Sequence, residues 1–269
     1  MDNKNINAPR RVKLEIDPAM LPETFAFFRE HETEEMPVMK LAAGLLGCDK
    51  GAAMPRELFD FIVDLYQEAI ASGDAVAMND LGALYYDGHG CEQDFAKAFH
   101  YYEMAAARGC SVAQENLGYC YYYGRNVPVD DEKAFRYFAL GAFTGHIASL
   151  YKIGDMYLNG RFVAKDPVEA FRIYDRCLNM MTDEAAPLTA GPVYLRLGDC
   201  LLNGIGTASD PKTALFCYQR AEQFLYDMVM NGEVWYKKSL ESAVEGQAKA
   251  REAALRALPD RPWPDSENA

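Results

Sequence analysis

Four residues with metal-binding or nucleophilic side chains stand close together in the segment DGHGCEQD, where they are Asp87, His89, Cys91 and Asp94. A calcium loop needs alternating oxygen ligands followed by a distal glutamate, and this segment has neither. A zinc site needs four ligands at short range, and the whole chain has only four histidines. We therefore expect no metal and no cofactor here. The segment instead predicts a glycine turn followed by a helix cap.

Other catalytic patterns are also missing from the sequence. It has no G-x-S-x-G motif, no glycine-rich phosphate loop and no histidine with an obvious carboxylate and nucleophile beside it. Cys91 and Cys110 would need a lowered thiol pKa to react, and no nearby residue predicts one. We therefore expect a protein without enzymatic activity. An enzyme is the alternative, because catalytic residues of a repeat protein can assemble from distant units.

Composition limits the possible partners and location. The chain has 269 residues, of which 50% are hydrophobic, and its 27 basic and 40 acidic residues give a formal net charge of −13. This charge repels nucleic acid and anionic lipid, so we expect neither as a partner. No segment approaches the roughly 20 apolar residues that cross a membrane, and the first residues lack a signal-peptide core. The seven cysteines have no C-x-x-C spacing, which favours reduced thiols and a cytoplasmic location.

A ten-residue motif, LGALYYDGHG in its first copy, occurs in four similar copies along the chain. We take the glycine of the LG or IG pair in each copy as position zero. These zero glycines are Gly82, Gly118, Gly154 and Gly198. The same register places glycine six positions later, aspartate at twelve, alanine at sixteen, and tyrosine or phenylalanine at twenty. So many matches in one register identify an internal repeat of about 36 residues, with one longer interval.

Each repeated residue type has a mechanical role. The glycine at zero and the alanine at sixteen let two helices approach closely, beside the aromatic ring at twenty. The glycine at six suits a left-handed helix end, and the aspartate at twelve suits an N-cap. Pro167 and Pro211 follow two of these aspartates, at the first helical position. Each unit is therefore helix, loop, helix and glycine turn. Such hairpins must stack to bury their apolar faces, which predicts an all-α, right-handed superhelical solenoid.

The repeat register divides the chain into successive segments. The divergent repeat should start with a helix around residues 35–46, and the inserted loop is NMMTDEAAPLTAGP, residues 179–192. The predicted segments are an N-terminal extension, partly irregular (1–34), a divergent repeat (35–76), two regular repeats (77–112 and 113–147), a repeat with the inserted loop (148–190), a last repeat (191–232), a capping helix (233–258) and a disordered tail (259–269).

At these residues the sequence resembles the Sel-like repeat family, whose units are related to tetratricopeptide repeats. The first copy matches the family pattern at Ala77, Leu81, Gly82, Tyr85, Gly88, Gly90, Asp94, Lys97, Ala98, Tyr101, Tyr102, Ala105, Ala106 and Gly109. The resemblance implies an adaptor or scaffold that holds other proteins in its groove, and it implies no reaction.

One secreted, cysteine-rich branch of that family has a disulfide in every unit and is associated with β-lactam binding or hydrolysis. This chain lacks the regular cysteine pairs. Cys200 and Cys217 are expected on facing helices of the fourth unit, and the sequence leaves open whether they form a disulfide. By analogy with this branch, the alternative function is an enzyme that acts on β-lactams or cell-wall fragments.

The resemblance also indicates where a partner would bind, because the first helix of each unit lines the inner curve of such solenoids. Positions −3, +1 and +4 around the zero glycine share one helix face. They are Asn79, Ala83, Tyr86, Glu115, Tyr119, Tyr122, Tyr151, Asp155, Leu158, Leu195, Asp199 and Leu202. This aromatic and aliphatic strip with three carboxylates predicts a protein or peptide partner with apolar anchors and basic residues. The alternatives are that the tyrosines pack between units, and that the chain self-associates.

Overall fold

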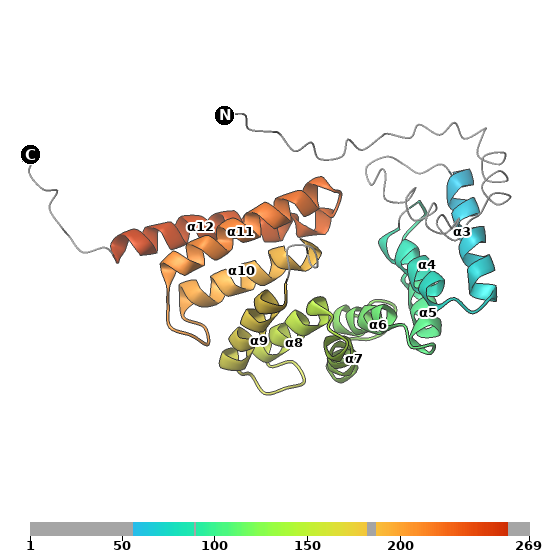
Figure 1. The fold of residues 1–269 in the computed structure, drawn as a ribbon, viewed down its shortest axis with the longest axis horizontal. Helices are drawn as coiled ribbons and strands as arrows, with labels where there is room; N and C mark the ends of the chain where they lie inside the picture. Colours follow the sequence, from blue (N-terminus) through green and yellow to red (C-terminus); the bar gives the residue numbers. More distant parts are fainter. Residues whose placement is uncertain (1–55, 89, 182–186, 258–269) are drawn as a thin grey trace, which may run out of the picture. The chain divides into compact units, whose positions relative to one another are not determined.

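The computed structural model describes residues 56–88, 90–181 and 187–257, which are almost entirely helical and contain no β-strand (Figure 1). This confirms the all-α prediction for the described part of the chain. The N-terminal extension, the helix expected around residues 35–46 and the tail from residue 259 lie outside the described residues. The helices are α3 (Arg56–Ala71), α4 (Ala75–Asp87), α5 (Phe95–Ala106), α6 (Ser111–Tyr123), α7 (Asp131–Phe143), α8 (Ile147–Asn159), α9 (Pro167–Met180), α10 (Pro187–Asn203), α11 (Pro211–Met230), the short 3-10 helix η2 (Val234–Tyr236) and α12 (Lys237–Arg256).

Consecutive helices pack as pairs, as the repeat register predicts. α4 packs against α5, α8 against α9, and α10 against α11. The zero glycines lie in α4, α6, α8 and α10, so these four are the first helices of the repeats. α3 precedes them and matches the second half of the divergent repeat.

The helices belong to two compact units. Unit 1 includes α3, α4, α5 and α6 as far as Cys120, together with residues 124–128. Unit 2 includes Tyr121–Tyr123 and the chain from Val129 onward. One core cluster of unit 1 is formed by α3 and α4, where Ile62 and Leu81 are fully buried. A second is formed by Met78 of α4, Ala105 of α5 and Ala113 of α6.

The predicted helix ends are confirmed in all four copies. The glycines at position six adopt left-handed φ angles between 64° and 71°, which a residue with a Cβ adopts only at a cost. They are Gly88, Gly124, Gly160 and Gly204. The aspartates at position twelve accept hydrogen bonds from amides in the first turn of the next helix. These caps are Asp94, Asp130, Asp166 and Asp210.

The zero glycine is needed because the aromatic ring at position twenty lies directly on the backbone of the first helix. A Cβ added at Gly154 would lie 2.7 Å from Cε1 of Tyr174. At Gly198 it would lie 2.9 Å from Cδ1 and Cε1 of Tyr218. Carbon atoms do not approach this closely, so only glycine admits the ring. The alanine at position sixteen is fully buried in every copy.

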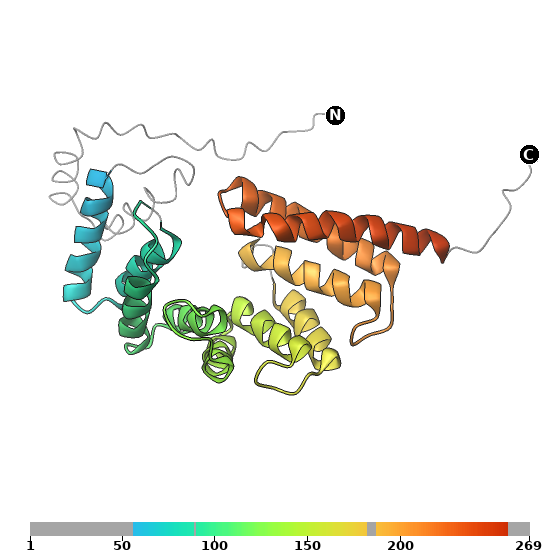
Figure 2. The same cartoon turned by 180° about the vertical axis from the view of Figure 1, so that it is seen from behind.

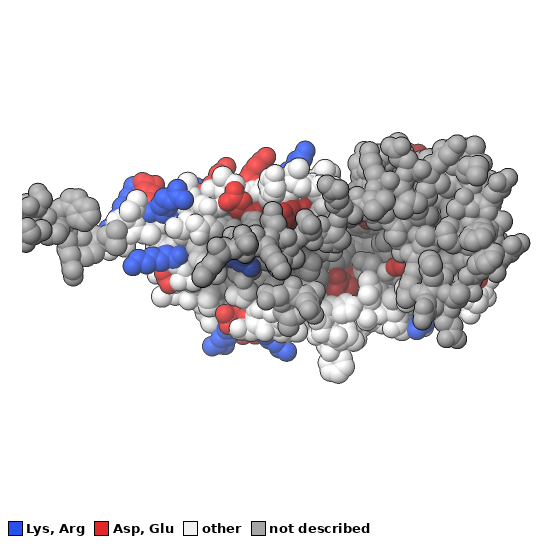
Figure 3. Space-filling view, turned by 45° about the horizontal axis from the view of Figure 1, so that its top comes forward, with Lys and Arg blue, Asp and Glu red and all other residues white. Residues whose placement is uncertain are grey.

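Unit 2 ends with α12, which lies along α11 (Figures 1 and 2). Ala243, Gly246 and Ala250 form its buried face. A Cβ at Gly246 would lie 2.3 Å from Cε1 of Tyr218, so this ring is held between glycines of α10 and α12. The remaining surface of α12 carries ion pairs, such as that of Lys249 with Glu245, together with the exposed apolar residues Val244 and Leu255. Figure 3 shows basic and acidic side chains interspersed over the C-terminal helices.

The structure differs from the prediction at the inserted segment, residues 179–192. α10 begins at Pro187 and includes Pro192, so the last part of the expected loop is helical. Burial explains this early start, because Val193 is fully buried and Gly191 lies against Leu225 of α11. This packing offsets the cost of a proline inside the helix. Residues 182–186 lie outside the described part.

Candidate binding face

The first-helix face is the set of side chains at positions −3, +1 and +4 of the four first helices. In unit 1 it begins with Asn79 of α4, which is buried. Asn116 of α6 donates a 3.0 Å hydrogen bond from Nδ2 to Oδ1 of Asn79. Asn79 in turn donates from Nδ2 to Oδ1 of Asp80, at 3.1 Å. Asn79 therefore links two first helices and presents little surface to a partner.

The other predicted positions of unit 1 are more accessible. Tyr86 is half-buried and packs edge-on against Phe95, with ring centroids 5.2 Å apart. Glu115 and Tyr119 on α6 are also half-buried. These three residues are therefore each partly exposed on the first-helix face of unit 1.

In unit 2, Tyr122 and Tyr151 are buried. The guanidinium of Arg161 stacks on the Tyr122 ring at 3.7 Å from its centroid, and its Nη2 donates to the Tyr122 carbonyl oxygen at 2.9 Å. Nε of Arg161 also donates to Oδ1 of Asp131, at 2.9 Å. Tyr122 is thus packed against a residue of the next repeat, as the alternative stated in the sequence analysis predicts.

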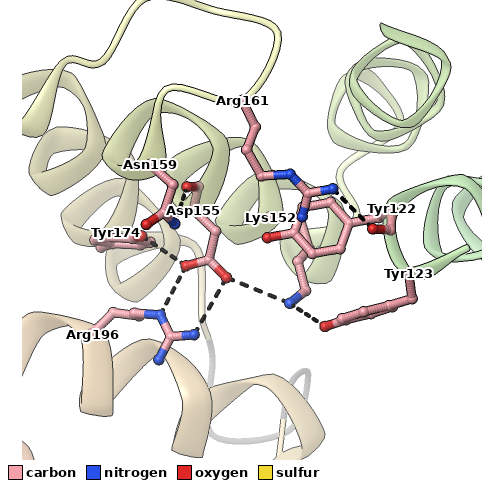
Figure 4. Close-up of polar contacts among 8 residues, drawn as sticks. All are labelled: Tyr122, Tyr123, Lys152, Asp155, Asn159, Arg161, Tyr174 and Arg196. Carbon is pink, nitrogen blue, oxygen red and sulfur yellow. Dashed lines mark hydrogen bonds and ion pairs between the residues drawn. The ribbon is translucent and has the colours of Figure 1, made fainter. Parts of the chain in front are cut away.

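Asp155 of α8 is the centre of a polar network that joins several helices of unit 2 (Figure 4). Only 3% of the residue is exposed. Its Oδ1 accepts from the hydroxyl of Tyr174 at 2.8 Å and from Nε of Arg196 at 2.8 Å. Its Oδ2 accepts from Nη2 of Arg196 and from Nζ of Lys152, each at 3.4 Å. The chain's own cations therefore neutralise this predicted partner-binding carboxylate.

Lys152 extends the network to the end of α6. It is 5% exposed, and its Nζ donates to the hydroxyl of Tyr123 at 2.9 Å. The Tyr123 residue is 49% exposed, and the Arg196 side chain is 32% exposed. The network is therefore buried at Asp155 and Lys152 and reaches the surface at Tyr123 and Arg196.

The electrostatics of Asp155 follow from these contacts. Burial alone would raise the pKa of Asp155, but the charges of Arg196 and Lys152 hold that pKa below its ordinary value. Burial also disfavours the charged form of Lys152 and alone would lower its pKa. Its neighbours Tyr151, Asp155 and Tyr123 outweigh this effect, and the pKa of Lys152 is raised. Both groups are consequently ionised at neutral pH.

Asp199 occupies the same repeat position on α10 and has a different environment. Its Oδ1 accepts from the hydroxyl of Tyr218 at 2.7 Å, and no ion pair reaches it from the described residues. Burial raises the pKa of Asp199, and the Tyr218 hydrogen bond and the more distant charges of Arg196 and Lys249 only partly oppose this. Asp199 is half-buried.

Of the three leucines of unit 2 at these positions, Leu195 is buried, whereas Leu158 and Leu202 are half-buried. Leu158 lies near the end of α8, and Leu202 packs beside the core of α10, α11 and α12. They give the first-helix face its aliphatic surface.

The four buried cysteines of the described residues are not activated as nucleophiles. Burial raises the pKa of Cys120 and Cys177 to about 12, and that of Cys200 and Cys217 to about 11. All four are free thiols, so Cys200 and Cys217 are not joined in this structure. Among the described residues, no cluster of three or more His, Cys, Asp or Glu side chains is suited to a metal ion. No described helix is long and apolar enough to span a bilayer.

Sequence reasoning missed the network partners, although the repeat register contains a signal for them. The two repeats with aspartate at +1, Asp155 and Asp199, also have tyrosine at +20, and each tyrosine donates to its aspartate. The same two repeats have a cation at −2, Lys152 and Arg196. These paired positions predict an internal network as well as a binding face.

Comparison with known proteins identifies the repeat. The sequence model of the Sel1 repeat matches residues 75–110, 111–142, 147–176 and 192–223. No protein with curated annotation matches the chain.

Two solved structures share the fold. A Sel1 repeat protein from Oxalobacter formigenes aligns over 74% of this chain and 80% of its own, with 24% identity and a TM-score of 0.53. The second is c5321, a protective antigen present in uropathogenic Escherichia coli strains that displays an SLR fold. It aligns over 88% of this chain and 56% of its own, with 20% identity and a TM-score of 0.50. At these identities the likeness shows the fold alone.

Proposed function

Because this chain belongs to the Sel1 repeat family, we propose that it is a non-enzymatic scaffold that binds a polypeptide segment on the first-helix face. Sel1 repeat proteins generally mediate protein–protein interactions and are typically non-catalytic. For this chain we propose, in addition, which surface binds the partner and which chemical groups the partner carries.

The observation that carries the proposal is the prearranged polar network of unit 2. Lys152 and Arg196 are held by Asp155, and Lys152 fixes the hydroxyl of Tyr123. Side chains that are already ordered lose little conformational entropy when a partner binds. Tyrosine and arginine are also the residues most enriched at the energetic centres of interfaces. Tyr123 and Arg196 are the ends of this network that reach the surface. They lie beside the first-helix face, because Tyr123 is one helical turn from Tyr119 and Arg196 is one turn from Asp199, and they are therefore suited to contact a polypeptide bound there.

The structure changes the roles that we assign to the predicted residues. In unit 2, Asp155 and Tyr122 support the surface, while Leu158, Asp199 and Leu202 contact the partner. In unit 1 the contact residues that we propose are Tyr86, Glu115 and Tyr119, which are half-buried. The partner segment then combines apolar anchors with basic side chains, as the strip of leucines, tyrosines and carboxylates favours.

The state of the thiols supports a non-enzymatic role. The raised pKa values of Cys120, Cys177, Cys200 and Cys217 keep these sulfurs protonated at neutral pH, and a thiol is a poor nucleophile compared with a thiolate. Free buried cysteines also fit a reducing compartment, and we propose the cytoplasm on this ground.

Peptide selection followed by calorimetry tests the proposal. Random 12-residue peptides are selected by display on the immobilised full-length chain, and the tightest one is titrated into wild type and two variants. Tyr123→Ala should weaken binding about tenfold, because it removes exposed contact area from the network. Phe143→Ala is the matched control, since Phe143 is 91% exposed at the end of a second helix, α7. Equal affinity for Tyr123→Ala and wild type would contradict the proposed face.

A further inference from the structure

Asp155 and Asp199 occupy the same position in consecutive repeats, but only one of them is paired with cations. Each follows a zero glycine and accepts a hydrogen bond from the tyrosine at position twenty. Asp155 also receives Arg196 and Lys152. Asp199 has Tyr218 as its only side-chain partner among the described residues. The charge of Asp155 is therefore compensated by cations of the chain, whereas no described cation forms an ion pair with Asp199 at the equivalent position.

The difference follows from the order of the repeats. Both cations stand two positions before a zero glycine: Lys152 before Gly154, and Arg196 before Gly198. Arg196 reaches back from α10 to α8 and pairs with the aspartate of the preceding repeat. By the same geometry, Asp199 would be paired by the cation of a following repeat. The chain continues instead with η2 and α12, which do not match the repeat.

α12 does not provide the missing cation. Its buried positions, Ala243, Gly246 and Ala250, are small and uncharged. Lys249 is close enough to influence Asp199 electrostatically, but its ion pair, 3.8 Å long, is with Glu245, and its side chain is 68% exposed. On α10 the other nearby charge is Arg196, whose Nε and Nη2 are both directed at Asp155 (Figure 4).

We propose that Asp199 binds a lysine or arginine side chain of the polypeptide partner, which takes the place that Arg196 takes at Asp155. This inference rests on the proposed function and assigns one contact within it. The Oδ1 atom of Asp199 stays on Tyr218, which orients the carboxylate, and Oδ2 receives the incoming cation. A charge-assisted hydrogen bond of this kind is stronger than a neutral one, and it is stronger still at a half-buried position.

The burial of Asp199 is consistent with this role. Its raised pKa means that the folded chain alone does not compensate the carboxylate charge. A bound cation would supply that compensation and lower the pKa of Asp199 in the complex. Asp155 shows this effect, since the two cations beside it hold its pKa low despite its deeper burial.

A double-mutant cycle with the selected peptide tests the contact. The peptide is titrated by calorimetry into wild type, Asp199→Asn and Asp175→Asn, and the titrations are repeated with peptides in which one Lys or Arg is replaced by Ala. Asparagine keeps an oxygen acceptor for Tyr218, so Asp199→Asn changes the charge and little else, which thermal melting verifies. Asp175 is an exposed residue on α9 and controls for the loss of one negative charge.

The expected result is that Asp199→Asn weakens binding about tenfold, that one Lys→Ala or Arg→Ala peptide weakens it equally, and that the two losses do not add. Asp175→Asn should bind like wild type. Full affinity in Asp199→Asn, for a peptide that Tyr123→Ala still weakens, would overturn this contact and leave the proposed function standing. Full affinity in both Asp199→Asn and Tyr123→Ala would overturn both proposals.

Discussion

Nε of Arg196 donates a 2.8 Å hydrogen bond to Oδ1 of Asp155, and this ion pair joins the first helices of two consecutive repeats. Nη2 of the same arginine reaches Oδ2 at 3.4 Å, so the guanidinium holds both oxygens of the carboxylate. Lys152 adds a second cation from α8 itself. Arg196 therefore has two effects: it joins α10 to α8, and it compensates the charge of one carboxylate of the first-helix face.

Asp155→Asn should destabilise the chain, whereas Asp199→Asn should change its stability little. The first substitution leaves Lys152 buried without its carboxylate and should cost about 3 kcal/mol. The second keeps an acceptor for Tyr218 and removes a charge with which no described cation forms an ion pair, so its effect should stay below about 1 kcal/mol. Urea denaturation followed by circular dichroism measures both. Equal losses in the free energy of unfolding for the two variants would show that the ion pairs of Asp155 do not stabilise the fold.

The stability of these variants should respond to acid with opposite signs. The folded-state pKa of Asp155 is lowered, so its ion pairs stabilise the fold above the unfolded pKa of about 3.9, and this contribution disappears as the pH falls through the folded pKa. The pKa of Asp199 is raised, so ionisation of Asp199 disfavours the fold above about pH 4, and acid relieves that penalty.

Urea midpoints at pH 7 and pH 3 test this assignment. The urea midpoint of wild type should be higher than that of Asp155→Asn at pH 7, and the difference between the two midpoints should be smaller at pH 3. Asp199→Asn should be at least as stable as wild type at pH 7 and lose that advantage at pH 3. A gap between wild type and Asp155→Asn that is unchanged by pH would refute the electrostatic origin of its stabilisation.

Gly246→Ala should loosen α12 from the rest of unit 2. The added Cβ would lie 2.3 Å from Cε1 of Tyr218, whose ring also lies against Gly198, so α12 must shift. Overpacking of this kind costs about 1–3 kcal/mol. Hydrogen exchange should show faster exchange of the α12 amides, while the exposed change Ser242→Ala should leave them protected. Unaltered protection in Gly246→Ala would mean that α12 is not packed on Tyr218.

Four thiols should stay unreactive until the chain unfolds. The pKa values near 12 for Cys120 and Cys177, and near 11 for Cys200 and Cys217, leave almost no thiolate at pH 7.5, and burial blocks access. Alkylation with iodoacetamide followed by peptide mass spectrometry should label them only in urea. Rapid labelling of Cys177 in the native protein would argue against the packing of α9 on α8.

The repeat positions that were predictable from sequence are those whose roles are local. Gly88 ends α4 in a left-handed conformation and Asp94 caps α5, because backbone geometry fixes these roles within a few residues. The glycine at zero also has a nearby cause, the aromatic ring twenty residues later. A single repeat contains all of this information.

The candidate site was less predictable because its chemistry depends on contacts between repeats. Helical spacing places Asp155 on the first-helix face, but Arg196, which pairs with it, is 41 residues away in the next repeat. Periodicity likewise does not distinguish a buried tyrosine such as Tyr122 from an exposed one such as Tyr123. Tertiary packing decides both points, and a helix-face pattern read from one repeat does not include it.

The most direct test of polypeptide binding on the first-helix face of unit 2 is site-specific photocrosslinking. A benzophenone amino acid replaces Tyr123 in one variant of the full-length chain and Phe143 in another, and each is irradiated with the display-selected peptide. Binding at this face should give an adduct from position 123 and none from position 143. An adduct from position 143 alone would contradict it.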